Sequence, residues 1–241
     1  MTDTFPERAF VWLGGILFVL SLAYCAYSYL VLWSALNGPF AYSASVFDTV
    51  LVSVFATHHS VFARDRVKRW LADTLPERLL RSVYVWTASV LLIVVCVLWQ
   101  PIGGSLYRAT GWQAIAHASI QLLGAGLIAW SVSVIDPLEL AGIRRVRGVP
   151  PTSDAANASA AARFQVAGPY RLVQHPLYLG WILAVFGPAH MTGDRLAFAA
   201  ITTIYLMIAI PWEERSLVGV FGDEYERYRR QVKWRVVPYI Y

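Results

Sequence analysis

The chain has 241 residues, of which 57% are hydrophobic and only 15% are charged, a composition typical of membrane proteins and not of soluble or disordered ones. Its formal net charge of +5 could indicate nucleic-acid binding, but the basic residues are distributed over three connections beside apolar segments and form no recognised binding module. We therefore expect membrane lipids as partners, through attraction to anionic headgroups, and no nucleic acid.

Six segments with few or no charges follow one another along the chain, each near the roughly 20 residues that a helix needs to cross a bilayer. They are 9–36, 41–63, 82–99, 109–135, 172–192 and 196–212. The second contains Asp48, and the fifth, whose helix is expected to start at Pro176, should be short and end near Pro188. We predict an all-α, multi-pass transmembrane bundle of about six spans, with a short hairpin made by the fifth and sixth.

The positions of lysine and arginine predict the orientation, because excess positive charge stays in the cytosol. All but two of the 20 lysines and arginines precede the first span or lie in alternate connections; the exceptions are Arg108 and Arg195. Both termini are therefore expected in the cytosol. The chain reads as a multi-pass protein of the bacterial inner membrane with its polar site facing the cytosol.

We expect one membrane domain over 1–241 with three parts. A front half of four spans covers 1–135, a cytosolic connection with an Ala/Ser-rich linker at 153–163 covers 136–167, and a hairpin with a charged tail covers 168–241. In the fourth span, Gly124-Ala125-Gly126 predicts close helix packing and not a nucleotide loop.

Polar side chains collect at the predicted cytosolic ends of the spans. In the stretch GPYRLVQHPLYLG at 168–180, Pro176 suits the first turn of a helix, whose free amide groups could meet a carboxylate or phosphate. A single histidine before a proline more often caps the helix or makes a local hydrogen bond than binds a ligand. The polar side chains at these cytosolic ends are His58, His59, Asp136, Glu139, Tyr170, Arg171, His175, Glu213 and Glu214.

Glu213 and Glu214 follow the apolar IAIPW at the end of the sixth span. Two adjacent carboxylates beside an apolar boundary are costly unless a cation pairs with them. The structural interpretation is an ion pair with a nearby arginine such as Arg215, and the functional one is a cationic ligand.

The tail 221–232 predicts an amphipathic helix, because Phe221, Tyr225, Tyr228 and Val232 share one face. This helix could lie on the membrane surface, cover a cavity, or do both.

Haem binding is a further alternative, since His59 and His175 share one predicted depth and His117 and His190 the other. Cys25 and Cys96 lie inside apolar spans as small hydrophobes, and neither a disulfide nor a metal site is expected from them.

The back of the chain resembles the integral-membrane methyltransferases related to isoprenylcysteine carboxyl methyltransferase and phospholipid methyltransferases. Their pattern is G-x-Y, R-H-P-x-Y, E-E-x-x-L and F-G-x-x-Y-x-x-Y. Here it reads GPY at 168–170, QHPLY at 174–178, EERSL at 213–217 and FGDEYERY at 221–228, with order and spacing kept over the last 75 or so residues.

A second resemblance covers the front half. The stretches HHSVFARDRVKRWL, RSVYVW, WQP and IDPLELAGIRRV look like those of bacterial methanethiol S-methyltransferases, and nurim-like and NnrU-like membrane proteins share parts of them.

The resemblance implies that S-adenosylmethionine is the cofactor. A site of acidic groups beside a helix N-terminus would suit its sulfonium, ammonium and carboxylate. The residues carried over as cofactor-binding are Gly168, Tyr170, His175, Pro176, Leu177, Tyr178, Glu213 and Glu214. A general base is not identified; His59 and His175 have the right predicted depth, and a thiolate could be held beside Arg64 or Arg171.

Two positions depart from the family pattern. Gln174 replaces the arginine before His-Pro, which removes a fixed charge. Ala209 stands where prenylcysteine enzymes carry a substrate-contacting arginine, which favours a small or uncharged nucleophile. The expected function is therefore methyl transfer to a small or lipophilic thiol, with methanethiol preferred. The alternatives are an isoprenylcysteine or phospholipid methyltransferase and a non-enzymatic nurim-like or NnrU-like protein with a degenerate site.

Overall fold

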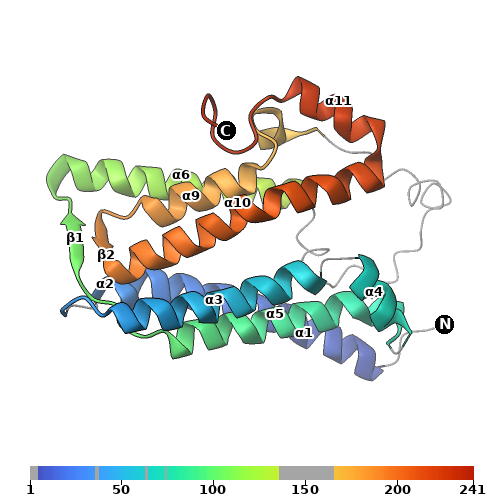
Figure 1. The fold of residues 1–241 in the computed structure, drawn as a ribbon, viewed down its shortest axis with the longest axis horizontal. Helices are drawn as coiled ribbons and strands as arrows, with labels where there is room; N and C mark the ends of the chain where they lie inside the picture. The colour runs from blue at the N-terminus through green and yellow to red at the C-terminus, as the bar shows by residue number, and fades with distance from the viewer. Residues whose placement is uncertain (1–4, 36–37, 63–64, 74, 136–165) are drawn as a thin grey trace. The chain divides into compact units, whose positions relative to one another are not determined.

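The computed structural model describes residues 5–35, 38–62, 65–73, 75–135 and 166–241 (Figure 1). The predicted linker at 153–163, together with Arg64, Asp136 and Glu139, lies outside the described residues. In chain order the elements are α1 (Phe5–Tyr27), η1 (Ser28–Leu32), α2 (Trp33–Ala35), α3 (Tyr42–Phe62), α4 (Asp65–Ala72), α5 (Glu77–Leu98), β1 (Ser105–Arg108), α6 (Gly111–Ile135), η3 (Gly168–Arg171), α9 (Pro176–Phe186), β2 (His190–Thr192), α10 (Gly193–Phe221) and α11 (Asp223–Gln231).

Among the described residues, four helical stretches are long and apolar enough to cross a membrane: Phe5–Ala35, Leu79–Leu98, Gly111–Ile135 and Gly193–Phe221. The predicted all-α membrane bundle is thereby confirmed, with one short ladder between β1 and β2 added. Helix α9 has 11 residues, or roughly 16 Å of rise, about half the hydrocarbon thickness. The number of spans and the side of the termini stay predictions.

Within the described residues, the chain divides into two compact units. The first holds 5–107 and 190–201, and the second holds 108–135, 166–189 and 202–241. The division falls inside α10, so the early turns of this helix belong to the first unit and its later turns to the second.

In the first unit, α1 packs against α5 where a glycine makes room for a tryptophan. The Trp86 indole donates to the Phe10 carbonyl at 3.0 Å and stacks on the Phe10 ring. A Cβ on Gly14 would lie 2.7 Å from the Trp86 indole nitrogen, so a larger residue there would collide with the ring.

Asp194 organises the connection after α5. One carboxylate oxygen accepts from the Trp99 indole and the Ile102 amide, both at 2.9 Å, and the other accepts from the Gly103 amide at 3.1 Å. Asp194 is fully buried. These bonds satisfy backbone amides that no regular element pairs, which a buried loop requires.

The neighbouring Arg195 binds main-chain carbonyls from two elements. Its guanidinium donates to the carbonyls of Tyr29, Leu30 and His190 at 2.9, 2.7 and 2.5 Å. Two of these carbonyls belong to η1, a π-helical stretch that interrupts the first helix. Such wide turns occur where a helix is adapted to a particular contact.

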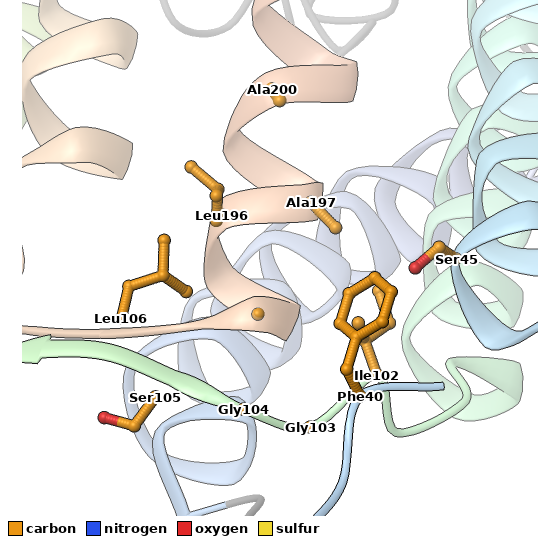
Figure 2. Close-up of a pocket in the computed structure, with 11 residues that line it drawn as sticks. Phe40, Ser45, Ile102, Gly103, Gly104, Ser105, Leu106, Leu196, Ala197 and Ala200 are labelled. Carbon is orange, nitrogen blue, oxygen red and sulfur yellow. The ribbon is translucent and has the colours of Figure 1, made fainter. Parts of the chain in front are cut away.

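A cavity of about 500 Å³ lies beside this region in the first unit. Figure 2 shows its wall formed by α10, the 102–106 segment and the start of α3. Apart from the hydroxyls of Ser45 and Ser105, the side chains that line it are apolar: Phe40, Ile102, Leu106, Leu196, Ala197 and Ala200.

In the second unit, α6 and α9 meet backbone to backbone. A Cβ on Gly124 would lie 2.5 Å from the Ala184 amide nitrogen and 2.6 Å from the Gly180 carbonyl. The close packing predicted for Gly124 is thus present, whereas a Cβ on Gly126 would meet none of the described atoms within 4 Å. Helix α9 is also joined to α10, because the Trp181 indole donates to the Thr202 hydroxyl at 3.0 Å.

The predicted amphipathic helix forms α11, which is separated from α10 at Gly222, whose φ is +52°. Glycine adopts this left-handed conformation without steric cost. Tyr225, Tyr228 and Val232 are buried and pack with Leu217, Val218, Phe221 and Val166. The aromatic face therefore contacts the protein itself, as a cover over α10 would.

Candidate functional site

The loop before α9 begins with a glycine that has no room for a side chain. Gly168 has φ of +54°, and a Cβ there would lie 2.9 Å from the indole nitrogen of Trp130 on α6. The loop is held from the other side by the Tyr228 hydroxyl, which donates to the carbonyls of Tyr170 at 2.9 Å and Val173 at 3.3 Å. Helix α11 thus fixes the loop that carries the predicted site residues.

Gln174 and His175 are attached to the segment that follows α11. The Gln174 side-chain amide donates to the Val232 carbonyl at 2.7 Å, and the Gln174 main-chain amide donates to the Trp234 carbonyl at 2.8 Å. The His175 amide donates to the Arg235 carbonyl, also at 2.8 Å. Gln174, which departs from the family arginine, therefore has a structural bond that uses its amide group.

The two adjacent carboxylates of α10 lie in different environments. The Glu213 side chain is 43% exposed and accepts a 2.5 Å hydrogen bond from the Tyr178 hydroxyl. The Glu214 side chain is 5% exposed and pairs with Arg229 at 3.4 Å and Arg235 at 3.2 Å. Glu214 is therefore neutralised from within the protein, whereas Glu213 is accessible and its hydrogen-bond donor is neutral.

The His175 ring lies between these carboxylates. Its Nδ1 is 3.7 Å from Glu213, and its Nε2 is 3.5 Å from Glu214. The ring stacks on Tyr178, with centroids 5.3 Å apart and planes 10° apart. His175 is buried, and the contact of its Nε2 with Glu214 is long for a hydrogen bond, so a ligand could compete for this nitrogen.

The phenols around the site stay protonated over the physiological range. Burial, and secondly the charge of Glu213, raises the pKa of Tyr170 to about 12. Burial also raises the pKa of Tyr225 and of Tyr228. All three are therefore neutral phenols, and the Tyr228 hydroxyl is a hydrogen-bond donor to the loop before α9.

All eight residues predicted to bind the cofactor belong to the second unit, on η3, the loop that follows it, α9 and the later turns of α10: Gly168, Tyr170, His175, Pro176, Leu177, Tyr178, Glu213 and Glu214. Pro176 is the first residue of α9, as predicted. Of the amides in that turn, those of Tyr178 and Leu179 are not free, because both donate to the His175 carbonyl. A free amide at Leu177 stays a prediction.

Arg171 and His59, considered above as a thiolate partner and a base, have other contacts. Arg171 is exposed and donates to the Val166 carbonyl at 3.4 Å. His59 belongs to the first unit, where its Nδ1 is 2.6 Å from the Tyr84 hydroxyl. The neighbouring His58 stacks on the same Tyr84 ring.

The histidines of the haem alternative are engaged in hydrogen bonds. His117 lies 3.2 Å from the Gly187 carbonyl, and His190 lies 3.1 Å from the Ser105 hydroxyl. Among the residues that the structure describes, no group of three or more His, Cys, Asp or Glu could hold a metal ion.

The sequence patterns do not identify Arg229 and Arg235 as partners of Glu214. They counted only as positive charge in a cytosolic tail, although a buried carboxylate at 214 requires a cation from somewhere. The partner expected from proximity, Arg215, instead lies over the Trp212 ring at 5.1 Å. No spacing in the sequence signals which arginine pairs with Glu214, because the pairing depends on tertiary structure.

Comparison with known proteins identifies the family. A methanethiol S-methyltransferase of Crocosphaera subtropica is 32% identical over 250 residues, which cover 100% of this chain and 96% of that protein. One of Mycobacterium tuberculosis is 36% identical over 194 residues, 78% of this chain and 76% of that protein.

A further match covers a shorter part of the chain. A protein-S-isoprenylcysteine O-methyltransferase of Schizosaccharomyces pombe is 35% identical over 68 residues, 27% of this chain and 29% of that protein. No family model matches the chain, and no solved structure does. Because its likeness to the Crocosphaera protein extends over the whole of its length, the chain belongs to the methanethiol S-methyltransferase family of membrane methyltransferases.

Proposed function

We propose that this protein transfers the methyl group of S-adenosylmethionine to methanethiol. The observation that carries the proposal is the identity of 32% over the full chain to a relative named for that reaction. S-adenosylmethionine, when bound, supplies an electrophilic methyl group on a sulfonium. The thiol sulfur forms the new S–CH₃ bond, the sulfonium S–CH₃ bond breaks to leave a thioether, and the thiol proton passes to water.

The side chains around His175 fit this donor. A sulfonium or ammonium needs an accessible negative charge, and Glu213 is the exposed carboxylate of the pair. Glu214 is the less suitable contact, because Arg229 and Arg235 already neutralise it. Two buried polar atoms could also engage a bound molecule: within the described residues, Oε1 of Gln174 has no hydrogen-bond partner, and Nε2 of His175 has a long contact of 3.5 Å with Glu214.

We assign the residues three tasks. Glu213 binds the cationic end of the donor, and Tyr178 orients the Glu213 carboxylate through its 2.5 Å hydrogen bond. His175 forms a polar contact beside them. The protein then accelerates transfer chiefly by holding donor and thiol aligned, without a covalent intermediate. No general base is assigned.

We further propose that this site faces the cytosol in a bacterial inner membrane. The distribution of lysine and arginine favours that orientation, and so does a water-soluble, charged methyl donor made inside the cell. Methanethiol, being small and apolar, can arrive from either the water or the lipid side.

The experiment measures two quantities on the purified full chain in lipid nanodiscs: binding of S-adenosylmethionine by calorimetry, and release of dimethyl sulfide into the headspace by gas chromatography. Glu213→Gln should raise the dissociation constant for S-adenosylmethionine about tenfold or more, as expected when one charge-assisted contact of roughly 1.5–3 kcal/mol is lost. His175→Ala should weaken binding as well.

Glu224→Gln is the matched control, since Glu224 is an exposed acid on α11. Unchanged binding in both site variants would remove the site assignment. Cofactor binding without release of dimethyl sulfide would instead point to another acceptor, such as a lipid or a prenylcysteine. Soret absorption of the purified protein would favour the haem alternative.

A further inference from the structure

The segment that follows α11 contacts the loop that carries Gln174 and His175. We call residues 232–235 the latch. Three hydrogen bonds join its carbonyls to Gln174 and His175, with lengths of 2.7, 2.8 and 2.8 Å. These bonds tie a loop without regular structure to a segment without regular structure. Neither partner is therefore positioned by a helix or sheet of its own.

Arg235 is the residue of the latch that contacts both the loop of His175 and helix α10. Its carbonyl accepts from the His175 amide, and its guanidinium nitrogen Nε lies 3.2 Å from Glu214 on α10. A third contact fixes the guanidinium, because Nη1 donates to the Tyr241 hydroxyl at 3.0 Å. One residue thus connects the loop of His175 with the helix of the carboxylates.

Arg229 does not duplicate this connection. It also pairs with Glu214, at 3.4 Å, but it lies on α11 and shares its guanidinium with Glu226 at 3.3 Å. Its main chain makes no bond to the 174–175 loop among those observed in the described residues. Losing Arg229 would remove one positive charge beside Glu214, whereas losing Arg235 would remove a positive charge there and also loosen the 174–175 loop.

We propose that Arg235 is a positioning residue, which holds His175 between Glu213 and Glu214 by pinning the latch to Glu214. The physical reason is that a carboxylate as buried as Glu214 keeps its cation close. That attraction keeps the latch carbonyls in register with the amides at 174 and 175. The consequence for affinity rests on the proposed function; the consequence for the loop does not.

The first arm of the test is hydrogen exchange of the peptide covering 170–176, measured without ligand. Arg235→Gln should accelerate exchange of the Gln174 and His175 amides about tenfold, because their acceptors become mobile. Arg235→Lys keeps the charge and should lie between wild type and Arg235→Gln. Arg230→Gln, which removes an equal charge from an exposed position on α11, should leave this exchange unchanged.

The second arm is the dissociation constant for S-adenosylmethionine. Arg235→Gln should raise it about tenfold, Arg235→Lys less, and Arg230→Gln not at all. If Arg235 acts through Glu214, adding Glu214→Gln to Arg235→Gln should cost little more than the single change, since coupled residues are not additive. A thermal melt of each variant identifies any that fail to fold.

The two arms separate the two ideas. Unchanged exchange at 174 and 175 in Arg235→Gln overturns the positioning role, whatever the ligand does. Additive effects of Arg235→Gln and Glu214→Gln on the dissociation constant overturn the route through Glu214. If the variants show the expected exchange rates but the wild-type protein does not bind S-adenosylmethionine, the role of the latch stands and the proposed function is refuted.

Discussion

The contact between α6 and α9 offers a sharp test, because two glycines of one helix have opposite surroundings. An alanine at position 124 would place its Cβ 2.5 Å from the Ala184 nitrogen and 2.6 Å from the Gly180 oxygen. Both are backbone atoms, so the helices must separate by roughly 1 Å to restore ordinary contact. Overpacking of this kind costs about 1–3 kcal/mol. A Cβ at position 126 would have none of the described atoms within 4 Å, so alanine fits there.

We expect Gly124→Ala to lower the melting temperature of the purified protein by several degrees, at about 2–4 °C per kcal/mol for a chain of this size. Gly126→Ala should leave it unchanged or raise it slightly, since alanine favours helix. Because α9 begins directly after His175 and carries Tyr178, Gly124→Ala should also weaken S-adenosylmethionine binding. Equal melting temperatures for the two variants would refute the backbone contact as the reason for a glycine at 124.

Two other variants test buried polar groups. Asp194→Asn replaces one of two carboxylate oxygens that accept three donors, so at least one donor loses its partner, and stability measured by thermal melting should fall by about 1–3 kcal/mol; an unchanged melt would contradict this. The pKa of Tyr170 is raised to about 12 in the folded protein, above its ordinary value of 10. Its contribution to stability is therefore full below pH 10 and is lost as the pH rises through 12. Tyr170→Phe should flatten the loss of stability across this window, and a slope identical to wild type would count against it.

The elements of the second unit follow patterns that are local in the chain. A helix starting at Pro176 and the amphipathic helix after Gly222 were both predicted, because each depends on neighbouring residues: a proline suited to the first turn, and an aromatic stripe of helical period. The close packing at Gly124 was predicted for the same reason.

The partners of the carboxylates could not be predicted in this way. Adjacent residues of a helix point about 100° apart, so one of Glu213 and Glu214 faces inward, but the sequence does not say which. The answer depends on where α11 and the latch lie, and those positions are set by packing across the chain. Arg235 is thus matched with Glu214 by tertiary structure and not by spacing.

Gln174 illustrates the same limit. From the sequence it was a lost positive charge. In the structure its amide bonds the Val232 carbonyl, 58 residues further along the chain. Its role there depends on the position of the latch, which no local sequence pattern predicts.

The π-helical turn of the first helix has a consequence for how the protein is made. The carbonyls of Tyr29 and Leu30 receive their donors from Arg195, which is synthesised about 165 residues later. Until the start of α10 enters the membrane, those carbonyls lack that partner in surroundings poor in water, where an unsatisfied carbonyl is costly. The first helix to be translated therefore reaches its final shape only after most of the chain has been inserted, and a nascent chain stalled before Arg195 should remain incompletely folded at its very beginning.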